Sequence, residues 1–452
     1  MTIGRLGLRR NRALRLAAII ALVAALGGCD KVKSLISGSD KTPLPGKRVS
    51  VLNLEHSLKP DPQLNALKIA VPRPFDNTAW PDAGGFPNHA MYHLALGDNL
   101  ERAWKSNAGE GAYRYGRVVA QPVLANDRIF TMDAEDIVTA FDAKSGSRLW
   151  RFDPQPEDAD ATTYGGGVAV AGNRVYIGTG YGEAIALDAA SGKVIWRTKV
   201  NAPIHSPPTV ADDRVFVVTV ENELDVLAAN DGHKLWSHNG LPEPAGLAGG
   251  ASPAVSGDLV VVPYSSGEIY ALRVENGRPL WNDSLAAAQP VGALSSLADI
   301  RGAPVIDRDR VFAISHSGLM VSIDLRTGDR VWEQDIGGVH APWVAGDFIY
   351  VLSADNELIC LTRADGRVRW ARELPQWNNP DKKKDPIFWS GPVLAGDRLI
   401  VISSEGEAFS VSPYTGEPLG RADFPDGVFI NPIVADKTLY VLTDEADLVA
   451  MR

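Results

Sequence analysis

The sequence predicts an all-β protein whose fold is an eight-bladed β-propeller with four strands in each blade. Two observations lead to this fold class. A ten-residue motif that ends in Trp recurs along the chain at intervals of about 40 to 50 residues. Before each copy lie three short runs rich in Val, Ile, Tyr and Phe, separated by Gly, Asp and Asn. These three runs and the run that ends in Trp supply the four strands of a blade.

The motif is represented by LDAASGKVIW at residues 187–196. A Gly precedes each Trp and can adopt the positive φ that a tight turn into the fourth strand requires. Further copies lie at residues 141–150, 227–236, 272–281, 323–332 and 361–370, and a copy at 411–420 has Gly420 in place of Trp. We therefore expect a structural, blade-docking role for Trp104, Trp150, Trp196, Trp236, Trp281, Trp332 and Trp370.

A small side chain stands ten residues before each motif Trp and leaves room for the indole. In one copy this residue is Cys360. We therefore interpret Cys360 as a buried core residue, with a reactive thiol as the alternative.

The two ends of the repeat region predict how the ring closes. Seven units are complete, and residues 430–452 supply three more strands before the chain stops. Residues 100–104 carry Trp104 with no strands before them. Pairing this N-terminal strand with the C-terminal strands completes an eighth blade and leaves no open edge at the junction.

The first 28 residues have the pattern of a secretory signal peptide. Five Arg residues precede the apolar run LAAIIALVAAL, which is too short and wrongly flanked for a membrane-spanning helix. The following Gly27-Gly28-Cys29 completes a stretch that resembles a bacterial lipobox. We therefore expect a lipoprotein signal peptide over residues 1–28 and lipidation of Cys29, which would anchor the protein in a membrane. The alternative is an ordinary signal peptide with a chance Cys.

Residues 29–95 do not belong to the repeat. Six Pro residues between positions 43 and 74, among many polar residues, suggest an extended tether that follows the lipidated Cys29. The propeller is then expected over residues 96–452. Because of Asp30, the choice between the inner and the outer membrane stays open, since in enteric bacteria an Asp at this position favours retention in the inner membrane.

The charge and the missing motifs exclude several classes of function. Removing residues 1–28 takes away five of the 45 Lys and Arg residues and none of the 55 Asp and Glu residues, so a formal charge of −15 remains. Nucleic acid is therefore not an expected partner. The sequence has no metal-ligand His spacing, no CxxC pair, no GxSxG elbow and no glycine-rich phosphate loop. We expect a monomeric propeller that is not an enzyme, with no catalytic residue, metal or cofactor, although a carboxylate cluster in the central channel stays open.

Three long connections between blades are candidate functional loops. The connections over residues 237–252 and 282–302 should emerge as neighbours on one face, and both mix apolar with charged residues. Such surface favours a protein contact; the alternative is that the leucines pack over the blade ends. The third connection, residues 371–389, carries three consecutive lysines that we interpret as a solvated tip. The candidate partner-binding residues are Leu247, Leu297, Asp299 and Arg301.

The repeat is similar to that of the pyrroloquinoline-quinone (PQQ) dehydrogenases, which are eight-bladed propellers. Many of those enzymes use a pair of adjacent Cys residues and calcium-binding acidic side chains, for which this chain has no recognisable counterpart. With the lipobox and the Pro-rich segment, the whole pattern resembles the BamB family of lipoproteins. The resemblance implies binding to the polypeptide-transport-associated (POTRA) domains of BamA and to other subunits of the outer-membrane β-barrel assembly (BAM) complex. It also implies assistance to unfolded outer-membrane precursors, and a place on the periplasmic side of the outer membrane.

The family's contact residues carry over only in part. Leu247, Leu297 and Asp299 match, whereas Ala248 stands in place of an Arg and Arg301 in place of an Asp. We expect Asp299 to be an exposed loop charge, so that Asp299→Lys weakens BamA binding without unfolding the protein. Two alternatives stay open: a periplasmic PQQ-dependent dehydrogenase, and a cell-envelope receptor for a sugar or peptide in the channel.

Overall fold

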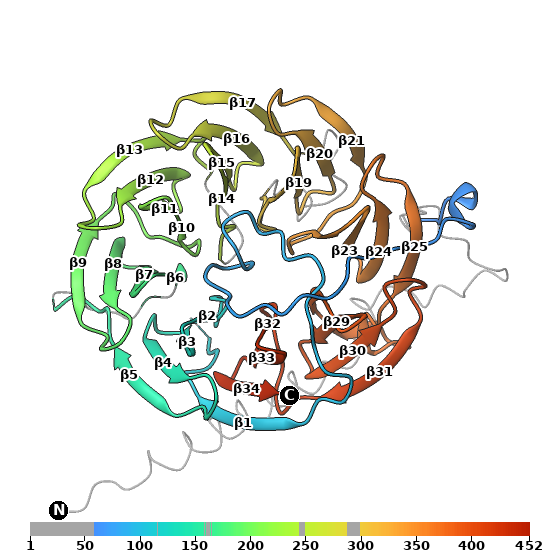
Figure 1. Ribbon diagram of the computed structural model, residues 1–452, viewed down its shortest axis with the longest axis horizontal. Coiled ribbons are helices and arrows are strands. Elements are labelled where there is room, and N and C mark those ends of the chain that lie inside the picture. Colours follow the sequence, from blue (N-terminus) through green and yellow to red (C-terminus); the bar gives the residue numbers. More distant parts are fainter. Residues whose placement is uncertain are drawn as a thin grey trace, which may run out of the picture. The chain divides into compact units, whose positions relative to one another are not determined.

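A computed structural model describes residues 58–114, 116–157, 159, 163, 165–243, 249–286 and 299–452. Residues 58–452 form one compact unit in which eight four-stranded sheets surround a central axis (Figure 1). The predicted eight-bladed propeller is therefore confirmed. Within the described residues, the one helical element is the short 3-10 helix η1 (Pro62–Leu64).

In the first four blades the chain runs from an innermost strand at the axis to an outermost strand at the rim. Blade 1 contains β2 (Val123–Ala125), β3 (Arg128–Met132), β4 (Val138–Asp142) and β5 (Arg148–Phe152). Blade 2 contains β6 (Gly167–Ala171), β7 (Arg174–Gly178), β8 (Glu183–Asp188) and β9 (Val194–Lys199). Blade 3 contains β10 (Thr209–Ala211), β11 (Arg214–Val218), β12 (Glu223–Ala228) and β13 (Lys234–Asn239). Blade 4 contains β14 (Ala254–Ser256), β15 (Leu259–Pro263), β16 (Glu268–Arg273) and β17 (Pro279–Ser284).

Blades 5 to 7 follow the same order. Blade 5 contains β18 (Val305–Asp307), β19 (Arg310–Ile314), β20 (Met320–Asp324) and β21 (Arg330–Gln334). Blade 6 contains β22 (Trp343–Ala345), β23 (Phe348–Leu352), β24 (Glu357–Thr362) and β25 (Val368–Glu373). Blade 7 contains β28 (Trp389–Ala395), β29 (Arg398–Ser403), β30 (Glu407–Val411) and β31 (Pro418–Asp423).

Blade 8 closes the ring. It contains β32 (Ile433–Ala435), β33 (Thr438–Leu442) and β34 (Asp447–Met451), with β1 (Arg102–Asn107) as its outermost strand. β1 pairs antiparallel with β34, and Trp104 faces Ala450 in the register. The predicted closure by an N-terminal strand is confirmed.

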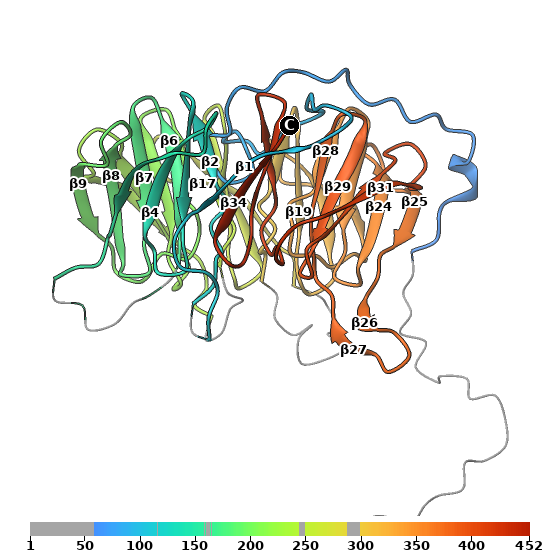
Figure 2. The ribbon, with the colours of Figure 1, turned by 90° about the horizontal axis from the view of Figure 1, so that it is seen from below.

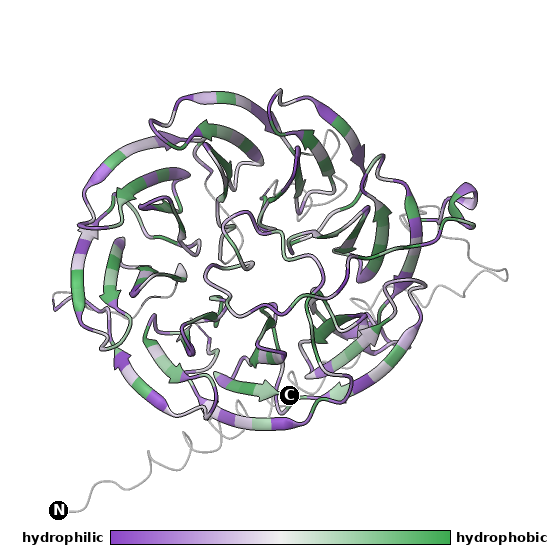
Figure 3. Cartoon of the chain, in the orientation of Figure 1, coloured by the Kyte–Doolittle hydropathy of each residue, from purple (hydrophilic) through white to green (hydrophobic). Residues whose placement is uncertain are grey.

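The burial of each strand depends on its distance from the axis. The middle strands are almost wholly buried, as in β23, where all five residues are buried, because neighbouring sheets cover both of their faces. The outermost strands are more exposed: most alternate in burial, as in β13, whereas all six residues of β31 are exposed. The hydropathy of the chain follows this gradient, with more hydrophobic residues in the middle strands than at the rim (Figure 3).

Each motif Trp joins its blade to the next one. The indole Nε1 of Trp150 in blade 1 donates to the carbonyl of Ala189 in blade 2 at 3.1 Å, and six other indoles repeat this bond along the ring. Gly192 of blade 2 lies against the same indole, since a Cβ added there would approach Trp150 Cδ2 to 2.7 Å. Gly192 also has a φ of +69°. The motif Gly therefore meets two requirements, a left-handed turn and a close approach to the indole of the preceding blade.

Residues 58–95 differ from the predicted tether. They pack on the propeller, and Trp80 and Leu94 within them are at most 1% exposed. The Pro-rich composition is compatible with this packing because the segment runs in an extended form over the blades. The expected lipidation site, Cys29, lies outside the described residues.

The two faces of the ring differ. The chain after η1 rises along the rim beside β25 and then crosses one face, whereas the hairpin of β26 (Trp377–Asn379) and β27 (Lys384–Pro386) projects from the other face (Figure 2). The lysines expected at a solvated tip, Lys382, Lys383 and Lys384, are exposed on this hairpin. None of the described residues forms a helix with the length and apolar character needed to cross a membrane.

Candidate functional site

The predicted partner-binding residues lie on two connections, from β13 to β14 and from β17 to β18. Leu247 and Leu297 lie outside the described residues. Asp299 and Arg301 are described and stand just before β18. The structure brings the two connections together, because Gly249 and Gly250 of the first and Asp299 of the second line one cavity of about 220 Å³.

The cavity lies against blades 3 and 4. Asn222, in the turn between β11 and β12, organises this part of the surface. Its Nδ2 donates to the carbonyl of Leu241 at 2.7 Å, and its Oδ1 accepts from the amide and the hydroxyl of Ser265 at 3.1 and 3.0 Å. One side chain therefore links a turn of blade 3, a turn of blade 4 and the first connection.

Hydrogen bonds fix the backbone of Leu241, whereas its side chain is exposed. Its amide donates to Oε2 of Glu268 at 2.6 Å, while 61% of the residue is exposed. Because the backbone at Leu241 is already fixed, a partner that covers this side chain would not have to order the chain there.

Asp299 differs from the expected exposed loop charge, since it is only 5% exposed. Its backbone carbonyl accepts from the amide of His316 at 2.9 Å, which holds the residue against blade 5. The expectation of an exposed loop charge is therefore wrong, and Asp299→Lys would place a cation in a buried position, so we now expect this variant to lose stability.

Arg301, on the second connection, lies against the first. A Cβ added at Gly249 would lie 3.1 Å from Nη2 of Arg301, so the guanidinium packs against the first connection. Burial lowers the pKa of Arg301, and the charge of Asp299 acts in the opposite direction. The two side chains therefore favour each other's charged forms.

The described lining of the cavity is acidic. It includes Glu243 and Asp299 but neither Lys nor Arg. His205 also lines it, and burial lowers the pKa of this imidazole, which favours its neutral form. The chain segments 244–248 and 287–298 contain no charged residue. The cavity therefore suits a basic or polar group of a partner.

Sequence reasoning found the two connections but missed Asn222 and Ser265. Both stand in turns between strands, where Asn and Ser are common for local reasons. Their link across two blades could not be recognised in the sequence.

The residues that the structure describes do not fit a quinone and calcium site of the dehydrogenase kind. Cys360 is buried and free, and burial raises the pKa of its thiol, so it is an inert core residue as the sequence indicates. Across the part of the chain that the structure describes, no group of three or more His, Cys, Asp or Glu side chains could hold a metal ion.

The repeat and the fold place this chain in the class of PQQ-like repeat propellers. The cavity between the two long connections lies on one side of this propeller. Within that class, the chain belongs to the family of the outer membrane protein assembly factor BamB, whose family model matches residues 134–372, more than half of the chain. The family and its relatives are named as assembly factors, so the expectation that this protein is not an enzyme is confirmed.

Two relatives show the extent of the similarity. The outer membrane protein assembly factor BamB of Shewanella oneidensis is 27% identical over 349 residues, which cover 75% of this chain and 86% of that protein. The BamB of Escherichia coli strain K12 is 27% identical over 344 residues, which cover 75% of this chain and 85% of that protein.

Solved structures share the fold. BamB from Moraxella catarrhalis has a TM-score of 0.66 and 21% identity, and the match covers 78% of this chain and 100% of that one. A europium-containing methanol dehydrogenase has a TM-score of 0.64 and 17% identity, and the match covers 80% of this chain and 89% of that one. At these identities the likeness establishes the propeller architecture alone.

Proposed function

We propose that this chain is a scaffold lipoprotein of the BAM complex, anchored through Cys29 on the periplasmic side of the outer membrane. It binds the POTRA domains of BamA and assists the insertion of outer-membrane proteins. Membership of the BamB family is the observation that carries the proposal. The acidic cavity between the two connections supports the choice of surface.

The partner surface that fits this site has a basic side chain next to an apolar patch. The basic side chain is complementary to Glu243 in the cavity lining, and the apolar patch covers the exposed Leu241. Arg301 occupies a position where the family has an acidic residue, so one ion pair of the family's interface is replaced by another arrangement here. Complementary charge sets specificity and association rate, and the apolar contact adds affinity.

The test is affinity purification of the tagged chain from detergent-solubilised membranes. We compare wild type with Leu241→Ser and Asp299→Asn, since Asn keeps the size of the buried Asp299 side chain. Leu67→Ser is the matched control, because Leu67 is also an exposed leucine, at 40% against 61% for Leu241, but lies beside β25 in blade 6.

A barrel protein with POTRA domains should be recovered with wild type and with the control, and its yield should fall about tenfold with Leu241→Ser, as for an interface residue worth about 1.4 kcal/mol. Equal recovery with all four proteins would move the site to another surface. If wild type recovers no such partner, the proposed role in the BAM complex is wrong.

A second candidate function, binding of unfolded barrel precursors, is favoured by the outermost strands. In six blades the residue just before the motif Trp or Gly420 is an aliphatic residue on an unpaired sheet edge, where an extended segment could add a strand. These residues are Leu149, Ile195, Leu235, Leu280, Val331 and Leu419, which are 37% to 59% exposed.

Blade 6 shows how such an edge accepts an extended segment. It has Arg369 at this position, and the chain's own N-terminal segment lies along β25. The amide of Asp61 donates to the carbonyl of Val368 at 2.8 Å, and Arg369 Nε donates to the carbonyl of Leu67 at 3.0 Å. A photo-crosslinking residue at position 195 should therefore capture a denatured barrel precursor, whereas the same residue at position 369 should not. Equal capture at both positions would exclude the outermost edges as the binding surface.

A further inference from the structure

Residues 77–96, here called the belt, pass round the central axis on the face opposite the β26–β27 hairpin (Figures 1 and 2). The belt is part of the folded core. Trp80 and Asp82 are each 1% exposed, and Leu94 is fully buried. His89 is 5% exposed, and its Nδ1 lies 2.7 Å from the carbonyl oxygen of Pro304.

The belt makes a hydrogen bond with the innermost strand, or the residue directly after it, in every blade. In blade 6 the indole Nε1 of Trp343 donates to the carbonyl of Tyr92 at 2.6 Å. In the other seven blades a backbone amide donates to the belt. These bonds are Leu124 N to Trp80 O (2.8 Å), Val170 N to Pro81 O (2.8 Å), Val210 N to Asp82 Oδ1 (3.0 Å), Val255 N to Pro87 O (2.7 Å), Ile306 N to Asn88 O (2.9 Å), Gly396 N to Leu94 O (2.9 Å) and Asp436 N to Asn77 O (2.7 Å).

These bonds lie at the innermost strands, where a propeller has unpaired sheet edges. The innermost strand is an edge of its sheet, so some of its N–H groups face the axis without a neighbouring strand. Unpaired edge groups are a template for pairing with another chain. The belt accepts a hydrogen bond from one such amide in seven of the blades and covers the edges with its own backbone.

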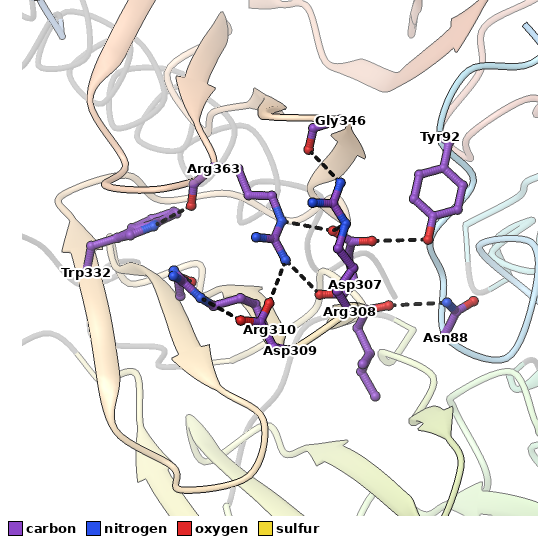
Figure 4. Close-up of polar contacts among 11 residues, drawn as sticks. Asn88, Tyr92, Asp307, Arg308, Asp309, Arg310, Trp332, Gly346 and Arg363 are labelled. Carbon is purple, nitrogen blue, oxygen red and sulfur yellow. Dashed lines mark hydrogen bonds and ion pairs between the residues drawn. The ribbon is translucent and has the colours of Figure 1, made fainter. Parts of the chain in front are cut away.

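Side chains add to these backbone bonds between blades 5 and 6. The hydroxyl of Tyr92 donates to Asp307 Oδ1 at 3.1 Å, and Nδ2 of Asn88 donates to the carbonyl of Ile306 at 3.2 Å (Figure 4). Both of these bonds go to β18 of blade 5, and the carbonyl of Tyr92 accepts from Trp343 of blade 6, so Tyr92 ties the belt to two neighbouring blades.

We propose that the belt is an intramolecular edge cap that closes the ring a second time, besides the β1–β34 pair, and denies the axis-facing edges of the blades to any other extended polypeptide. The outermost edges then remain as the surfaces where an extended partner can add a strand. This inference concerns the belt alone and does not depend on which partner the two connections bind.

Amide-resolved hydrogen exchange on the full chain tests the proposal. Asp82→Ala removes the acceptor of the Val210 amide, and Asp82→Asn is the matched control because its Oδ1 can still accept this bond. In Asp82→Ala the exchange of the Val210 amide should rise about tenfold, as expected for loss of one buried hydrogen bond. The Gly396 and Asp436 amides, on the far side of the ring, should stay protected. Unchanged exchange at Val210 in Asp82→Ala would overturn the capping role.

A second variant tests the whole belt. Residues 77–96 are replaced by a Gly-Ser linker of equal length, which keeps β1 in the chain. All seven capped amides should lose protection, and the protein should self-associate through its uncovered edges, as measured by light scattering. A variant that remains monomeric with protected amides would contradict the proposal. If this variant does not fold, the comparison of the two Asp82 substitutions decides.

Discussion

Arg363 of blade 6 and Asp307 of blade 5 form a buried ion pair in which Arg363 Nε donates to Asp307 Oδ2 at 2.9 Å (Figure 4). Arg363 Nη2 also donates to the backbone carbonyl of Asp307 at 2.9 Å and to Asp309 Oδ1 at 3.0 Å. The carbonyl of Arg363 accepts the indole hydrogen bond of Trp332 at 3.0 Å. Arg363 therefore accepts the indole hydrogen bond that is repeated around the ring and also forms an ion pair. The residues that accept this indole bond in the other blades are uncharged.

Arg363→Met should lower the free energy of unfolding by up to about 3 to 5 kcal/mol, because Asp307 is fully buried and would keep only the longer ion pair with the half-exposed Arg308, at 3.5 Å. Urea denaturation measures this loss. Arg367→Met is the control, since Arg367 is 41% exposed and pairs with the exposed Asp365, so its loss should change the stability much less than the loss of Arg363. Adding Asp307→Asn to Arg363→Met should recover part of the stability. Equal effects of the two single substitutions would contradict this account.

Gly192→Ala should destabilise the protein more than Gly172→Ala. Both glycines have positive φ, +69° and +59°, so both substitutions carry a similar backbone cost. A Cβ at Gly192 would meet Trp150 at 2.7 Å, whereas a Cβ at Gly172 would meet nothing within 4 Å. The difference in unfolding free energy should be about 1 to 3 kcal/mol, the usual cost of overpacking. Equal losses in thermal and chemical denaturation would show that the indole moves aside at no cost.

Asp82→Asn should change how stability depends on pH. Burial raises the pKa of Asp82 from 3.8 to about 8, so the folded state keeps the neutral acid while the unfolded state ionises. The stability that this group contributes is therefore present below pH 3.8 and is lost as the pH rises towards 8, at up to about 1.4 kcal/mol per pH unit.

Asn cannot ionise, so the variant should gain stability relative to wild type as the pH rises from 4 to 8, and the difference should level off above pH 8. Denaturation curves over this range measure the difference. Burial also lowers the pKa of His89 to about 4, but this effect is common to both proteins and cancels in the comparison. A difference that stays constant with pH would mean that Asp82 is ionised in the folded protein.

Cys29→Ser should abolish lipidation, because only a thiol can carry the thioether-linked lipid that the lipobox pattern predicts. Metabolic labelling with a radioactive fatty acid should mark wild type and leave the variant unlabelled. Membrane fractionation of wild type then decides between the inner and the outer membrane, which Asp30 leaves open. Labelling of the variant would exclude Cys29 as the anchor.

The sequence indicates the candidate site only in outline. The lengths of the two connections and their apolar residues point to the region that contains the cavity, since a long connection disturbs the spacing between successive Trp residues. The burial of Asp299 and the bridge made by Asn222 could not be predicted, because each depends on atoms from another blade. Asn222 contacts Ser265 across 43 residues of chain, and no local pattern records such a contact.

The sequence by itself determined the all-β class, the number of blades and the closure of the ring by β1. Each of these follows from a pattern that is local and repeated, so every copy of the Trp motif supports the others. The tertiary structure alone decided the course of the belt, the burial of Asp299 and the Arg363–Asp307 pair. The belt is the clearest case, because its bonds join Asn77 to Asp436 and Asn88 to Ile306, and each bond occurs once. Contacts between segments that meet only after the ring has formed leave no periodic trace in the chain.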